Sequence, residues 1–189
     1  HQDHLDRPIT EPEVWSAIRE LKLGKAPGVD GVLTDIIKHA ADAVGKGRLG
    51  QGNTVVTAIA TLFNFMFERE VWPDSCRWSR GVIFPIHKHD SRLDPGNYRP
   101  ITLLSTVGKL FGSIVENRLS TWSEKHNVLS DHQGGFRRGR GTPDTFIDAR
   151  KAFDTVWREG NYVRLHDLGV RGKMWRQLQA MNRDRQSKI

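Results

Sequence analysis

In one segment of this sequence apolar residues occur at every second position, as in a β-strand. Segments with the spacing of helices lie on both sides of it. Within residues 80–88, Val82, Phe84 and Ile86 recur at every second position, so a strand would hold them on one face. Apolar residues before and after this segment recur at the spacing of amphipathic helices instead. This mixture predicts a helix-rich α+β fold.

The expected helices begin and end at recognisable signals. Thr10-Glu11-Pro12-Glu13 has the spacing of a capping box and starts a first helix, which stops at Gly24. Asn53 starts another helix, which Trp72-Pro73 ends. Further helices are expected over 33–43, 101–125, 149–157, 159–167 and 172–185, with a polar loop over 89–98.

Composition restricts the size of the fold and its partners. With 189 residues and 37% hydrophobic content, the chain can form one ordinary core or two small lobes. A formal net charge of +7 favours a polyanionic partner, and nucleic acid rather than a membrane because no basic amphipathic helix stands out. The single cysteine, Cys76, excludes an internal disulfide and a multi-thiolate zinc site.

The chain shows neither a membrane span nor a secretion signal. No apolar run is long enough to cross a bilayer, and the N-terminus lacks the charged start and apolar stretch of a signal peptide. Together with a lone cysteine, which suits a reducing compartment, this predicts an intracellular protein that is not secreted. Because the chain opens at His1 rather than a methionine, we expect it to be an internal piece of a longer protein.

Asp148 is a candidate metal ligand. It follows the short apolar segment Thr145-Phe146-Ile147, and a carboxylate at a strand end can be aimed at a divalent cation. The same position also suits a helix N-cap, and the local sequence favours the cap. In a helix Asp154, six residues on, would be turned by about 240° from Asp148, so the two carboxylates would not share one ion.

The candidate binding cations of this chain can each be explained in two ways. Arg137, Arg138 and Arg140 lie among glycines and could grip a sugar-phosphate backbone, but a solvated basic loop explains them equally well. Lys88 and Arg99 could contact a triphosphate or be ordinary surface charges.

Two further sequence patterns do not support the binding sites that they suggest. The segment 24–28 lacks the Gly-Lys-Ser/Thr close of a P-loop, and His87 and His89 have no third ligand that would make a zinc site.

Taken in order, five landmarks resemble the reverse transcriptase of non-LTR (LINE-like) retrotransposons, over nearly the whole chain. The landmarks are 25–31 (Lys-Ala-Pro-Gly-Val-Asp-Gly), Trp78 with 83–88 (Ile-Phe-Pro-Ile-His-Lys), 94–104 (Asp-Pro-Gly-Asn-Tyr-Arg-Pro-Ile-Thr-Leu-Leu), 133–142 (Gln-Gly-Gly-Phe-Arg-Arg-Gly-Arg-Gly-Thr) and 148–154 (Asp-Ala-Arg-Lys-Ala-Phe-Asp). The resemblance implies part of a right-hand polymerase, with fingers over 1–134 and a basic loop and the beginning of an incomplete palm over 135–189.

The resemblance also implies roles for residues near the catalytic centre. Asp148 is similar to the first metal-binding and catalytic aspartate of the palm, and the backbone carbonyl of Ala149 to a neighbouring ligand, for two Mg²⁺ ions in the complete enzyme. Phe153 falls where the family places the aromatic side chain that blocks a ribose 2′-hydroxyl. The backbone amides near Lys151 and Ala152 would assist in binding the nucleotide. Phe153 also shares a helical face with Val156 and Trp157, and a core role explains that spacing.

The remaining implied roles concern nucleic acid and the triphosphate. Arg99 and Lys88 resemble fingers residues that neutralise the incoming deoxynucleoside triphosphate. The arginines Arg137, Arg138 and Arg140 would lie along an RNA template or DNA primer, and Lys25 is similar to a fingers residue near the template. The implied protein is intracellular and, in a eukaryotic host, nuclear, without a membrane partner; its oligomeric state is not indicated.

Two departures from the family limit the expected activity. Only Pro143–Ile147 separate Thr142 from Asp148, where the family has a helix and most of a palm strand, so either residues are missing or this copy has a deletion. The chain also lacks the Tyr/Phe-Ala-Asp-Asp tetrapeptide that supplies the remaining metal carboxylates. We therefore expect negligible polymerase activity from this chain alone.

Two alternatives stay open beside the polymerase fragment. One is a non-catalytic remnant that retains the basic surface and binds nucleic acid. The other is a relative in the group II intron lineage, although the segment 97–104 (Asn-Tyr-Arg-Pro-Ile-Thr-Leu-Leu) favours the LINE-like branch.

Overall fold

The computed structural model describes residues 3–44, 52–73, 78–130, 133, 135, 137, 139, 140, 157–183 and 186–188. The chain divides into two compact units. The first comprises His1–Arg7 with Val115–Trp175, and the second Pro8–Ile114 with Arg176–Ile189. Each unit is therefore described separately below.

Three helices form the first part of the second unit. They are α2 (Glu11–Glu20), α3 (Thr34–Val44) and α4 (Thr54–Arg69), and α4 contacts both of the others. The capping box expected at Thr10 is confirmed, because its side chain accepts from Glu13 N while the Glu13 carboxylate accepts from Thr10 N. The Asn53 side chain caps α4 as expected and also donates to Ala41 O at 2.6 Å, which fixes α3 against α4.

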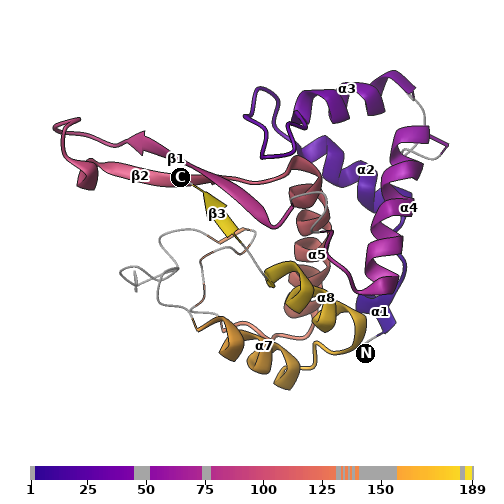
Figure 1. The fold of residues 1–189 in the computed structure, drawn as a ribbon. Coiled ribbons are helices and arrows are strands. Elements are labelled where there is room, and N and C mark those ends of the chain that lie inside the picture. The colour runs from indigo at the N-terminus through magenta and orange to yellow at the C-terminus, as the bar shows by residue number, and fades with distance from the viewer. Residues whose placement is uncertain are drawn as a thin grey trace. The chain divides into compact units, whose positions relative to one another are not determined.

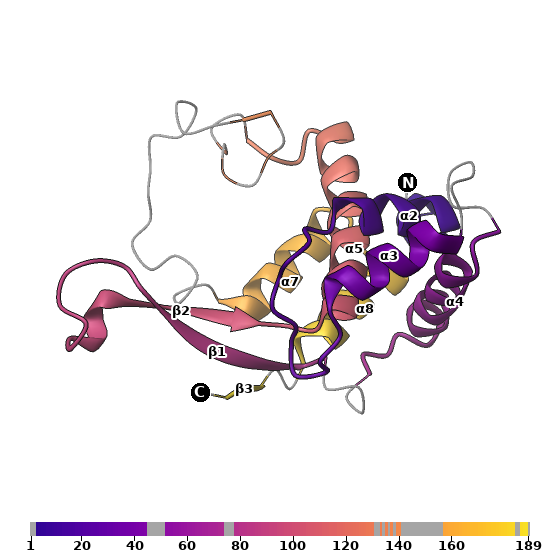
Figure 2. The ribbon, with the colours of Figure 1, turned by 90° about the horizontal axis from the view of Figure 1, so that it is seen from above.

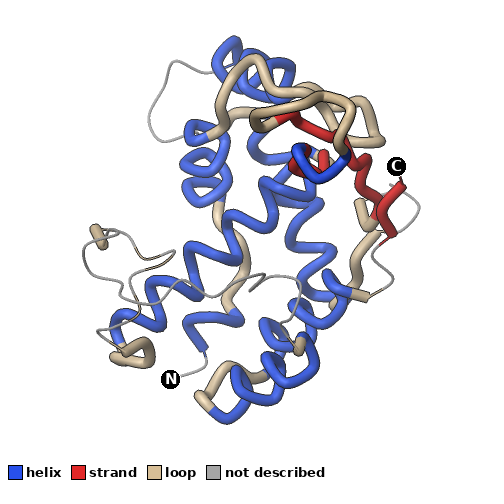
Figure 3. Tube along the Cα trace, turned by 90° about the vertical axis from the view of Figure 1, so that its left-hand side faces the viewer, coloured by secondary structure: helices blue, strands red, loops and turns tan. Residues whose placement is uncertain are grey.

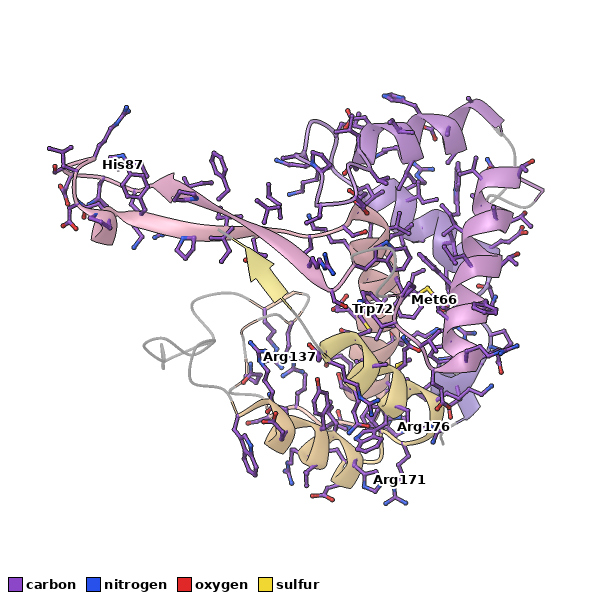
Figure 4. The ribbon with its side chains drawn as sticks, in the orientation of Figure 1. Met66, Trp72, His87, Arg137, Arg171 and Arg176 are labelled. Carbon is purple, nitrogen blue, oxygen red and sulfur yellow. The ribbon has the colours of Figure 1, made fainter. Side chains whose placement is uncertain are left out.

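The core of the second unit lies between these helices and the start of α5 (Thr106–Lys125). The rings of Phe63 and Phe111 meet edge to face with their centroids 5.1 Å apart. Trp72 makes the same kind of contact with Trp78 at 5.5 Å, and Figure 4 marks Trp72 and Met66 in this region. The largest fully buried side chains of this unit are Val14, Ile18, Val56, Phe63, Met66, Phe67, Leu110, Phe111, Ile114 and Gln177.

A three-stranded sheet completes the second unit. β1 (Arg80–His87) pairs antiparallel with β2 (Tyr98–Leu103) over Val82–His87, and parallel with β3 (Gln186–Lys188) at Arg80–Val82. The register sets Pro85 opposite Pro100. Figure 1 and Figure 2 both show the β1–β2 hairpin extending away from α2, α3 and α4, and Figure 3 marks the strands in red.

The expectation of one helix over 101–125 is wrong for its first residues. Residues 101–103 belong to β2, because they pair with Val82–Phe84. The helix starts after Ser105, whose hydroxyl accepts from Gly108 N at 3.1 Å. A short apolar run such as Ile101–Leu104 does not distinguish strand from helix by spacing.

The first unit contains α1 (Asp3–Asp6), the second half of α5, α7 (Arg158–Asp167) and the start of α8 (Gly172–Asn182). Arg118 is buried on α5 and donates to Arg7 O at 2.7 Å and to Leu5 O at 3.2 Å. The Asp6 carboxylate accepts from Met174 N at 2.8 Å and so holds the start of α8. These bonds satisfy backbone groups that would otherwise be buried without partners.

The C-terminal expectations are met in part. The helix expected over 159–167 is confirmed as α7, and the one over 172–185 ends earlier, at Asn182. The strand β3 was not predicted, and residues 149–156 lie outside the described residues. Among the helices that are described, none has the length and apolar character needed to cross a membrane.

Candidate nucleic-acid interface

One face of the β1–β2 hairpin is apolar and exposed. Its register places Val82, Phe84 and Ile86 on the same face as Ile101 and Arg99. The apolar residues of this face are largely exposed: Val82 is 37% exposed, Phe84 57%, Ile86 45% and Ile101 43%. The expectation that Val82, Phe84 and Ile86 share a face is confirmed, but this face is open to solvent and is not part of the core.

The two cations expected to bind a triphosphate lie on this hairpin. Arg99 is exposed and sits in register with Ile86. Lys88 is exposed, its amide donates to Asn97 O at 2.8 Å, and it lies two positions beyond Ile86. Lys88 lies one residue beyond the end of β1, and strand alternation continued to it would put it on the face of Arg99. The hairpin thus carries two exposed cations and an exposed aromatic ring, Phe84.

The turn beyond the strands is held by its own polar groups. The Asp94 carboxylate accepts from Gly96 N at 2.8 Å, and the Asn97 amide donates to Ser91 O at 2.9 Å. The Tyr98 hydroxyl donates to Arg92 O at 3.0 Å, and the Tyr98 ring lies 5.3 Å from that of His87, which Figure 4 labels. The hairpin end that carries Lys88 is therefore locally ordered.

His87 and His89 both contact Asp90. The His87 Nε2 atom lies 3.2 Å from Asp90 O, and the His89 Nδ1 atom lies 2.5 Å from a carboxylate oxygen of Asp90. Within the part of the chain that the structure describes, no group of three or more His, Cys, Asp or Glu residues gathers as a metal site would.

The loop of Lys25 packs against the junction of β2 and α5. A Cβ atom on Gly28 would lie 2.5 Å from both Leu104 C and Ser105 N, so only glycine permits this approach. Lys25 itself is exposed and follows Gly24, whose φ is +67°. Two of the sequence landmarks, 25–31 and 94–104, are thus in direct contact.

Arg137 differs from the other expected nucleic-acid contacts because its guanidinium is engaged by the protein. Its Nε and Nη2 atoms donate to the two carboxylate oxygens of Glu124 at 2.8 and 2.7 Å. Its Nη1 atom donates to Ser130 O at 2.9 Å, and its side chain is only 9% exposed. Arg140 is exposed, and Figure 4 labels Arg137.

The expected catalytic centre is not described. Asp148, Ala149, Lys151, Ala152 and Phe153 all lie outside the described residues, and so does Arg138. Their assignment as metal, nucleotide or nucleic-acid ligands remains a prediction.

Sequence reasoning missed two features of the interface. It did not single out Glu124, since nothing in the local sequence connects this residue to an arginine 13 positions later. Alternation identified the apolar face of β1 but could not tell whether that face is covered. The exposed Ile101 was assigned to a helix.

Comparisons with known proteins agree on one family. The family model for "Reverse transcriptase (RNA-dependent DNA polymerase)" matches residues 86–189. The probable RNA-directed DNA polymerase from transposon BS of Drosophila melanogaster is 30% identical over 184 residues, which are 86% of this chain and 19% of that protein.

Two further relatives show the same pattern of coverage. The RNA-directed DNA polymerase from mobile element jockey of Drosophila melanogaster is 28% identical, over 80% of this chain and 18% of that protein. The Pol polyprotein from retrotransposable element R2 of Popillia japonica is 28% identical, over 88% and 23%. The chain therefore spans about a fifth of the length of these relatives.

Proposed function

We propose, from the fact that this chain belongs to the reverse transcriptase (RNA-dependent DNA polymerase) family, that it supplies the fingers and the beginning of the palm of a retrotransposon polymerase of right-hand architecture. Residues 1–134 would be the fingers, and 135–189 the basic loop and the start of the palm. The whole protein would copy an RNA template into DNA from deoxynucleoside triphosphates. A nuclear site of action in a eukaryotic host fits its likeness to insect mobile-element proteins.

The hairpin face is the single observation that supports this proposal best. Arg99 shares one exposed face with Phe84, and Lys88 is exposed just beyond the end of β1. Cations beside an apolar surface suit a ligand with a polyphosphate and a flat base. We propose that these two cations neutralise the incoming triphosphate. Lys25, on the loop that packs at the foot of β2, would lie towards the template.

Catalysis is assigned to residues outside the described part of the chain. We propose Asp148 and the carbonyl of Ala149 as ligands of Mg²⁺, which when bound supplies positive charge for the attacking and leaving oxygens of nucleotidyl transfer. The amides of Lys151 and Ala152 would bind the nucleotide, and the Phe153 ring would exclude a ribose 2′-hydroxyl. Arg138 and Arg140 would contact template or primer.

The proposal is tested on the complete protein by steady-state primer extension on an RNA template. If Arg99 and Lys88 bind the triphosphate, Arg99→Gln and Lys88→Gln should each raise the KM for the deoxynucleoside triphosphate by about tenfold, the equivalent of one charge-assisted hydrogen bond. The matched control is Arg92→Gln, an exposed cation in the turn beyond β1. An unchanged KM in both variants would refute the assignment.

The same assay on the 189-residue chain separates catalysis from binding. Because its sequence has no Tyr/Phe-Ala-Asp-Asp, we expect RNA binding without primer extension. Robust extension by the chain alone would contradict this expectation. Absence of extension by the complete protein would favour a nucleic-acid-binding remnant instead.

A further inference from the structure

All three nitrogens of the Arg137 guanidinium donate to groups of the protein itself. Both arms of its fork reach Glu124, at 2.8 Å from Nε and 2.7 Å from Nη2. The remaining nitrogen, Nη1, donates to Ser130 O at 2.9 Å and to Gln133 O at 3.4 Å. A phosphate would need the same planar fork, and here a carboxylate occupies it.

Glu124 lies where a carboxylate needs a partner. It belongs to the last turn of α5, where the partial negative charge of the helix end disfavours a second negative charge. It also borders a depression of about 160 Å³ with Asn117, Ser120 and Thr121, and its side chain is 46% exposed. An unpaired carboxylate there would repel a nucleic-acid phosphate, and Arg137 neutralises it.

The same arginine also sets the backbone of the loop that carries Arg140. Arg137 O accepts from Arg140 N at 3.4 Å, and Gln133 N donates to Ser130 O at 3.0 Å. Gly139, between the two arginines, has φ +75°, a conformation that suits glycine and a tight turn. The position of Arg140 therefore depends on where Glu124 holds Arg137.

We infer that Arg137 is a positioning residue and not a phosphate ligand. With Glu124 it forms a carboxylate–guanidinium clasp, defined here as these two side chains, that fixes the turn 137–140 to the end of α5 so that Arg140 faces the nucleic acid. This inference rests on the proposed function, because it takes the turn 137–140 to bind an RNA phosphate.

The test is the salt dependence of binding of a single-stranded RNA oligonucleotide by the 189-residue chain. The slope of log affinity against log salt counts phosphate contacts, at about 0.7 per contact. Glu124→Gln with Arg137→Gln removes the clasp at constant net charge, and Arg137→Lys keeps the charge but loses the fork. Arg140→Gln is the reference for a lost phosphate contact, and circular dichroism confirms that each variant keeps its helices.

The clasp predicts a distinct result for each variant. Arg140→Gln should lower the slope by about 0.7. The double glutamine variant and Arg137→Lys should both bind about fivefold more weakly at every salt concentration, with the slope unchanged.

Two results together would overturn this inference but leave the proposed function intact. The slope of the double glutamine variant would fall as far as that of Arg140→Gln, and Arg137→Lys would bind RNA like the wild type. Affinity without any salt dependence in the wild-type chain would overturn the proposed function and, with it, this inference.

Discussion

Asn64 and Ile9 exchange two hydrogen bonds although 55 residues separate them in sequence: Ile9 N donates to Asn64 Oδ1 at 2.6 Å and Asn64 Nδ2 donates to Ile9 O at 2.7 Å. The side-chain amide on α4 thus takes the place of a strand partner for the segment that leads into α2. Both bonds are partly buried, so water replaces them poorly.

Replacing this amide should destabilise the second unit. Asn64→Ala leaves the donor and acceptor of Ile9 without partners and should lower the free energy of unfolding by about 2 kcal/mol in urea denaturation. Thr61→Ala is the matched control, because it removes an exposed hydroxyl from the same helix and should change stability by less than about 0.5 kcal/mol. Equal effects of the two changes would contradict the role given to Asn64.

The close approach of Gly28 to Leu104 predicts a steric effect. Gly28→Ala would place a methyl group against the backbone of Leu104 and Ser105, and should cost about 2–3 kcal/mol of unfolding free energy. Gly31→Ala separates this clash from backbone strain, because Gly31 has φ +70° but no atom within 4 Å of its added Cβ. It should cost about 1 kcal/mol. The packing of the Lys25 loop would be disproved if Gly28→Ala cost no more than Gly31→Ala.

Two phenylalanines allow the same substitution to be compared in the core and on the hairpin. Phe63 is fully buried, so Phe63→Ala should cost about 3–5 kcal/mol. Phe84 is 57% exposed, and Phe84→Ala should cost less than about 1 kcal/mol. Thermal unfolding followed by circular dichroism measures both, and a large loss in the second variant would show that the hairpin face is covered.

Glu70 combines a favourable ion pair with an unfavourable backbone. It ends α4 with φ +54°, and its carboxylate accepts from Arg176 at 2.6 Å on both oxygens. Glu70→Ala loses the partly exposed ion pair and should cost up to about 1 kcal/mol. Glu70→Gly loses the same pair but relieves the left-handed strain, so it should be more stable than Glu70→Ala by about 1 kcal/mol. Identical stabilities in chemical denaturation would argue against this strain.

Local signals in the sequence predicted the starts of those helices that neighbouring residues cap, but not their ends: α2 ends at Glu20 and not at Gly24, and α4 at Arg69 and not at Trp72-Pro73. Asn53 caps α4 through bonds to Val55 N and Val56 N, and the Thr10 box starts α2, so both helices were predicted at their correct starts. The strand β1 was recognised from alternation alone. In each case the information lies within a few residues of the element itself.

The features that the sequence did not reveal depend on distant residues. Tyr98–Leu103 becomes a strand because β1 lies beside it, and β3 exists only through its pairing with Arg80–Val82. The same holds for the candidate site. Lys88 and Arg99 were named as possible triphosphate contacts from the sequence, but the face that Arg99 shares with Phe84 follows from the hairpin register. The engagement of Arg137 by Glu124 required the fold.

The facing prolines of the hairpin have a consequence for solubility. Pro85 and Pro100 stand opposite each other in the ribbon whose one face is apolar and exposed, and β3 covers only the first three residues of β1. Such a ribbon would ordinarily template the addition of strands from other molecules. Each proline removes an amide donor at the middle of its strand, so a strand from another molecule would find a break in the ladder there. The hairpin can therefore keep an apolar surface for a ligand while resisting self-assembly into larger sheets.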